Sequence, residues 1–75
     1  MAPLREVRTK MLLTVRDLAA RAGVAHGTVH LIETGQRIPH LSTIRRLSEA
    51  LGVAPEEVDE FQTAIDEANR GKDAA

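Results

Sequence analysis

Apolar residues recur three or four positions apart along most of the chain, and no stretch alternates apolar and polar residues as a half-buried strand does. This pattern predicts an all-α fold. Five helices fit the spacing, with expected ranges of residues 3–12, 15–22, 26–34, 41–51 and 55–68. Residues 69–75 are small and polar, so we expect a flexible tail after one domain of residues 1–68.

Capping residues, glycines and prolines mark where these helices begin and end. Thr14 and Asp17 have the spacing of a capping box, in which each side chain accepts a backbone N–H of the other residue. Gly23 and Gly35 can adopt the left-handed conformation that ends a helix. Pro55 suits a first helical turn, and the two glutamates after it favour the positive end of the helix dipole. The expected architecture is a compact five-helix bundle.

The composition excludes several classes of function. The chain has 75 residues and no cysteine, so disulfides, thiolate catalysis and cysteine-based zinc sites are not available. Phe61 is the one aromatic residue, which argues against stacking platforms for single-stranded nucleic acid and against a deep aromatic ligand pocket. No apolar run approaches the ~18 residues that span a bilayer. We expect a cytoplasmic protein that is not an enzyme and binds no cofactor, small molecule or membrane.

The formal net charge of -1 conceals a strong asymmetry along the chain. Residues 1–46 hold eight Lys and Arg against three Asp and Glu, a net charge of +5. Residues 47–75 hold two Lys and Arg against eight Asp and Glu, a net charge of -6. One half is therefore suited to face a polyanion while the other faces away. A chance segregation of solvated charges is the alternative.

Two short helices joined by a glycine-containing turn form the layout of a helix-turn-helix, whose second helix presents side chains to base edges in the major groove. Residues 14–35, TVRDLAARAGVAHGTVHLIETG, have this layout. Here the sequence resembles the phage-repressor and Cro-like (XRE-type) helix-turn-helix family, with its lambda-repressor-like fold, over residues 4–61. The matching features are Leu18-Ala19, Gly23-Val24, Thr28-Val29, Ile32-Glu33, Gly35 and the run PHLSTIRRLSEALGV at residues 39–53.

The resemblance implies a regulator of transcription that binds double-stranded DNA, acting as a homodimeric repressor on a pseudo-palindromic operator. The same fold serves antitoxins that repress their own operon, and the acidic C-terminal helix would then bind the toxin. The family also pairs an arginine of the first helix with a glutamate ending the third, which assigns a structural ion pair to Arg8 and Glu33. The alternative is a protein–protein interaction module that keeps the scaffold without sequence-specific DNA readout.

The predicted recognition helix lacks the usual base readers, because no Arg, Gln or Asn stands between His26 and Leu31. The candidates that remain for base readout are His26, Gly27, Thr28, His30 and Leu31. Histidine and threonine can hydrogen-bond to bases, and Gly27 would let the backbone approach the DNA closely. A merely solvent-exposed helix face explains the same residues. The candidates for phosphate contacts are Arg16, Gln36, Arg37, His40, Ser42, Thr43, Arg45 and Arg46.

Two further features leave alternatives open. His26 and His30 lie one helical turn apart, a spacing that can hold a metal ion, but structural zinc needs four ligands, so we expect no metal site. Tighter DNA binding at lower pH is the simpler expectation for this histidine pair. The last helix offers a two-fold apolar seam for a dimer, made of Phe61, Ala64, Ile65 and Ala68. Alternatively, Phe61 only closes the core of one chain.

Overall fold

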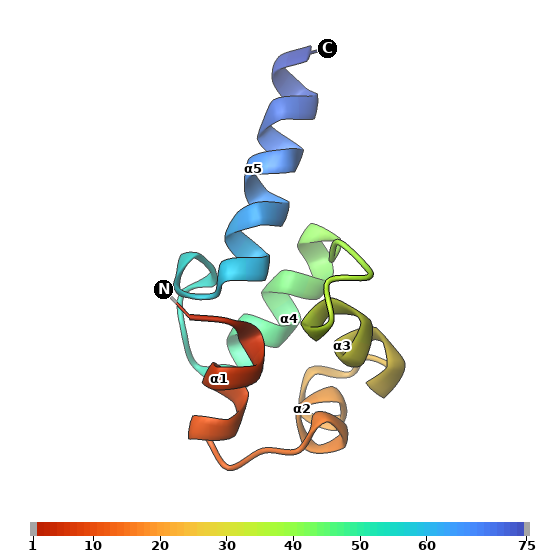
Figure 1. The fold of residues 1–75 in the computed structure, drawn as a ribbon, viewed down its shortest axis with the longest axis vertical. Coiled ribbons are helices and arrows are strands. Elements are labelled where there is room, and N and C mark those ends of the chain that lie inside the picture. The colour runs from red at the N-terminus through yellow and green to blue at the C-terminus, as the bar shows by residue number, and fades with distance from the viewer. Residues whose placement is uncertain (1, 75) are drawn as a thin grey trace.

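A computed structural model describes residues 2–74, with side chains to residue 70, and this part of the chain is all helical apart from its connections. The elements are α1 (Leu4–Lys10), α2 (Val15–Ala22), α3 (His26–Glu33), α4 (Leu41–Leu51), the 3-10 turn η1 (Pro55–Glu57) and α5 (Asp59–Ala74). The predicted all-α class with five helices is confirmed. In Figure 1, α2 and α3 lie beside α4, and α5 projects away from them.

Local hydrogen bonds explain where α2 begins and ends. The Asp17 N–H donates to the Thr14 hydroxyl at 3.0 Å, and the Thr14 N–H donates to the Asp17 carboxylate at 3.0 Å, which completes the capping box. Gly23 ends the helix with φ of 71°, a left-handed conformation that costs a glycine little. The Val24 N–H then donates back to the Ala19 carbonyl at 3.0 Å and closes the turn.

One apolar core joins all the helices. Its fully buried side chains are Leu4, Leu18, Val29, Ile32, Leu47, Leu51, Val58 and Phe61. The N-terminal segment is tied to the start of α5, because the Ala2 N–H donates to the Glu57 carbonyl at 3.1 Å and the Asp59 N–H donates to the Ala2 carbonyl at 2.9 Å. This single bridge between Ala2 and Val58 was not evident in the sequence pattern.

The last helix differs from the prediction at both ends. Residues 55–57 form a 3-10 turn, and Val58 is extended (φ -110°, ψ 123°) because its backbone lies in the bridge with Ala2, so α5 begins only at Asp59. The helix then continues to Ala74, beyond the end predicted at residue 68 and through most of the predicted tail. Residue 75 lies outside the described residues. Side-chain pairs one turn apart, Gln62 with Asp66 and Glu67 with Arg70, support the projecting part.

The first helix is shorter than predicted. It ends at Lys10, and Leu12 adopts φ of 60° with 90% of its surface exposed. The Leu13 N–H donates to the Arg8 carbonyl at 3.3 Å, as at other helix ends with a left-handed residue, and Leu13 turns into the core. A leucine therefore occupies a position that normally suits glycine or asparagine.

Candidate nucleic-acid interface

The position of α3 follows from its buried face. Val29 and Ile32 are fully buried against the rest of the core, so the opposite face of this eight-residue helix is directed to solvent. The connection from α2 consists of Gly23, Val24 and Ala25, and no side chain caps the start of α3 at Ala25. The buried core thus holds a short helix with one free face.

The five candidates for base readout all lie on α3. His26, Gly27 and His30 are exposed, whereas Thr28 and Leu31 are half-buried. A Cβ built on Gly27 meets no atom within 4 Å, so packing within the chain gives no reason for glycine at this helical position. The free face therefore offers two imidazoles and a stretch of open backbone, flanked by a hydroxyl and an apolar side chain.

The candidates for phosphate contacts fall into three places. Arg16 is exposed in the first turn of α2. A second group occupies the connection after α3 and the start of α4: Gln36, Arg37, His40 and Ser42, which are exposed, and Thr43, which is half-buried. Arg45 and Arg46 lie further along α4. Within the part of the chain that the structure describes, Arg16, Arg37 and Arg45 form no ion pair, so their charges remain available to an external anion.

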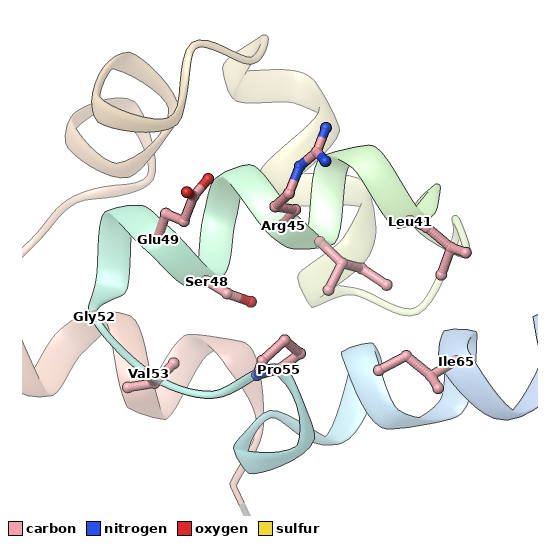
Figure 2. A pocket seen from close by; sticks show the side chains of 9 residues that line it. Leu41, Arg45, Ser48, Glu49, Gly52, Val53, Pro55 and Ile65 are labelled. Carbon is pink, nitrogen blue, oxygen red and sulfur yellow. The ribbon is translucent and has the colours of Figure 1, made fainter.

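The structure separates the two adjacent arginines of α4. Arg45 lies beside a groove between α4 and α5, and Figure 2 shows its guanidinium pointing away from α5. Arg46 instead donates from Nη1 to the Gly23 carbonyl at 3.3 Å, within the turn between α2 and α3. The sequence predicts phosphate contacts for both residues, because nothing near Arg46 in the chain indicates that its side chain reaches Gly23.

Arg8 and Glu33 form a bidentate ion pair between α1 and the end of α3. Arg8 Nε donates to Glu33 Oε2 at 2.6 Å, and Nη2 donates to Oε1 at 3.0 Å. The third guanidinium nitrogen, Nη1, donates to the Leu13 carbonyl at 2.8 Å. The hydrogen bond to Glu33 raises the pKa of Arg8 above its ordinary value. The two side chains are 11% and 8% exposed, so this contact is largely removed from water.

The predicted dimer seam is only partly accessible. Phe61 is fully buried and Ala64 is 3% exposed, because both belong to the core of a single chain, which corrects their assignment to a dimer interface. Ile65 and Ala68 remain half-exposed on α5. Sequence reasoning missed a neighbouring exposed apolar residue, Leu41, which is 56% exposed at the start of α4.

A groove of about 540 Å³ runs between α4 and α5, beside Leu41 and Ile65 (Figure 2). Its walls include Leu41, Ile44, Val53, Pro55 and Ile65. The Ser48 hydroxyl points from α4 into this space, is buried, and has no hydrogen-bond partner among the described residues. No pattern in the sequence predicts the groove, because α4 and α5 approach each other only after the turn at η1.

Two other findings concern the described residues alone. They contain no group of three or more His, Cys, Asp and Glu side chains arranged to hold a metal ion. None of the described helices is both long enough and apolar enough to cross a membrane.

One comparison with known proteins gives a match. The family model for the helix-turn-helix domain matches residues 2–61, which covers α1 to the start of α5. No curated protein and no solved structure matches the chain significantly. The match confirms the helix-turn-helix layout, while the closer likeness to phage-repressor and Cro-like proteins stays a prediction.

Proposed function

This chain belongs to the helix-turn-helix domain family of DNA-binding domains, and from that premise we propose that it regulates transcription by placing α3 in the major groove of double-stranded DNA. The supporting observation is the division of α3 into a buried face, with Val29 and Ile32, and a free face that carries His26 and His30. A helix of eight residues is about 12 Å long, and the major groove is about 12 Å wide and accepts a helix.

Base readout would come from the free face of α3. His26 and His30 can donate hydrogen bonds to base acceptors, and Leu31 can pack on a thymine methyl group. Gly27 leaves its backbone open, since no atom lies within 4 Å of its built Cβ, and a base edge could approach there without a clash. The chain therefore relies on few hydrogen-bonding side chains and on close backbone approach.

Phosphate contacts on both sides of α3 would orient it. Arg16, exposed at the start of α2, would contact one strand, and Arg37, His40 and Ser42, exposed around the start of α4, would contact the other. The charge distribution supports this orientation, because residues 1–46 carry the excess of Lys and Arg. The acidic α5 projects away from α2 and α3 in Figure 1, where it would avoid repulsion by phosphate.

The finer part of the proposal is a homodimeric repressor on a pseudo-palindromic operator. A two-fold axis brings the same patch of two chains together. The patch that supports this arrangement consists of Leu41, Ile65 and Ala68, which are accessible and apolar in one chain. An antitoxin that represses its own operon is one role of this kind, with the acidic side chains of α5 directed to the toxin.

The experiment that tests DNA binding is a titration of the ¹⁵N-labelled protein with a duplex selected from a random-sequence library. We expect amide shifts in α3, at the start of α2 and at the start of α4. Arg37→Glu should abolish binding, whereas Arg70→Glu, the same charge change on α5, should leave it intact. Shifts confined to α5 and the groove, or no shifts with any duplex, would favour the protein-interaction module instead.

A further inference from the structure

We propose that Arg46 is a positioning residue for the recognition helix. From α4 it holds the turn between α2 and α3 and thereby sets the orientation of α3 on DNA, and it is not a phosphate contact. The inference rests on the proposed function, since an orientation on DNA matters only if α3 binds DNA. Two features support it: Arg46 donates a hydrogen bond to Gly23, and Gly23 lies in the turn that connects α2 to α3.

The contact joins residues that are 23 positions apart. Arg46 Nη1 donates to the Gly23 carbonyl at 3.3 Å, and the same nitrogen lies 4.0 Å from a Cβ built on Gly23. Among the described residues, no backbone N–H donates to this carbonyl, and two N–H groups of the turn and α3 donate elsewhere, that of Val24 to Ala19 and that of Thr28 to Ala25. Arg46 is therefore the partner that satisfies the Gly23 carbonyl within the chain.

The electrostatics of the turn favour a cation at this place. The last carbonyls of a helix lack partners within the helix and form the negative end of its dipole. Gly23 is the C-cap of α2, so the guanidinium of Arg46 lies at that negative end. Arg46 thus caps α2 from a different helix. Both Arg46 and Gly23 are exposed, but the backbone of α4 at this point is held in place because the next residue, Leu47, is fully buried in the core.

A small change in the turn would move α3 by a large distance. Only Gly23, Val24 and Ala25 separate the two helices, so the direction of the Gly23 peptide determines how α3 leaves α2. A tilt of about 10° at the turn would move the far end of an eight-residue helix, about 12 Å away, by about 2 Å. Hydrogen bonds between side chains and bases do not tolerate such a displacement. Loss of the Arg46 contact should therefore reduce specific recognition more than general attraction to DNA.

The adjacent Arg45 provides a matched control. It is on the same helix, has the same charge and is exposed, but it has no hydrogen-bond or ion-pair partner among the described residues. We therefore compare Arg46→Met, Arg46→Lys and Arg45→Met with the unmodified chain. Methionine keeps most of the aliphatic length without charge or donor, and lysine keeps the charge and donor atoms.

The experiment measures affinity for a selected duplex and for a scrambled duplex across salt concentration. For Arg46→Met we expect about a tenfold loss on the selected duplex, an unchanged affinity for the scrambled duplex and an unchanged slope of log affinity against log salt. Arg46→Lys should recover part of the loss. If Arg46 contacts phosphate, the slope falls by about 0.9 and both duplexes lose affinity together, which overturns the proposal. Equal behaviour of Arg46→Met and Arg45→Met also overturns it.

A second measurement tests the contact without DNA. In the free protein, Arg46→Met should shift the amide signals of Val24 and Ala25 and speed their hydrogen exchange, while the cooperative thermal unfolding is retained. Unchanged turn amides would overturn the proposal. If the unmodified chain binds neither duplex, the proposed DNA function fails, and the turn amides still report whether Arg46 holds the turn.

Discussion

The ion pair between Arg8 and Glu33 should contribute more to stability than any exposed pair in this chain. Glu33→Met would leave the guanidinium of Arg8 with only the Leu13 carbonyl as a partner, in a site where its side chain is 11% exposed. Removing one member of a largely buried pair costs about 3–5 kcal/mol, and the residual exposure favours a value of about 3 kcal/mol. A domain of this size has about 4–11 kcal/mol in total, so the loss would be severe.

A double-mutant cycle measures this contribution directly. Arg8→Met, Glu33→Met and the double variant are unfolded with urea, and the transition is followed by far-UV circular dichroism. We expect each single variant to lose about 3 kcal/mol, and the double variant to lose little more than either, because no charge is then left without a partner. The resulting coupling energy should exceed about 2 kcal/mol.

Glu6 and Lys10 provide the control pair. They lie one turn apart on α1 at 3.7 Å, with side chains 51% and 72% exposed, and should show a coupling energy of about 0.3–0.5 kcal/mol. If the cycle for Arg8 and Glu33 gives a coupling energy as small as this, the argument from burial and geometry is refuted.

Three further predictions concern single positions. Leu12→Asn should stabilise the fold by up to about 1 kcal/mol in urea unfolding, because Leu12 has a left-handed backbone conformation and is 90% exposed. An equal gain for the control Met11→Asn would show that backbone strain at Leu12 is not the cause. Gly27→Ala should stabilise the free protein by up to about 1 kcal/mol yet weaken binding to a selected duplex about tenfold; unchanged or tighter binding would contradict close backbone approach. The backbone hydrogen bond from Thr14 lowers the pKa of Asp17 in the folded protein. The ionised carboxylate therefore stabilises the fold above the pKa of about 3.9 that it has in the unfolded chain, and this contribution is lost as pH falls through the lower pKa of the folded state. Asp17→Asn should therefore flatten the acid dependence of urea unfolding, and an unaltered profile would show that this carboxylate contributes nothing.

The sequence predicts those features that depend on local chemistry. Thr14 and Asp17 form the expected capping box, and Gly23 ends α2 in the left-handed conformation, because three or four consecutive residues determine each of these structures. Val29 and Ile32 are apolar and three positions apart, a helical spacing, and both are fully buried, which leaves the opposite face of α3 as the candidate interface.

Features that depend on tertiary contacts could not be predicted in this way. Val58 has the spacing of a helical residue, but pairing with Ala2 holds it extended and delays the start of α5. Phe61 is apolar at a position compatible with either a dimer seam or the core, and only the packing of α5 decides for the core. The contact of Arg46 with Gly23 joins distant segments, so nothing in the local sequence distinguishes Arg46 from Arg45.

The central claim is that α3 reads a sequence in double-stranded DNA, and a salt titration tests it most directly. Affinity is measured for a duplex selected from a random library and for a scrambled duplex of the same composition. We predict that log affinity falls steeply with log salt and that the selected duplex binds about a thousandfold more tightly, as is usual for specific binders. If neither duplex binds at low salt, or if the two bind equally, α3 does not read sequence and the account is contradicted.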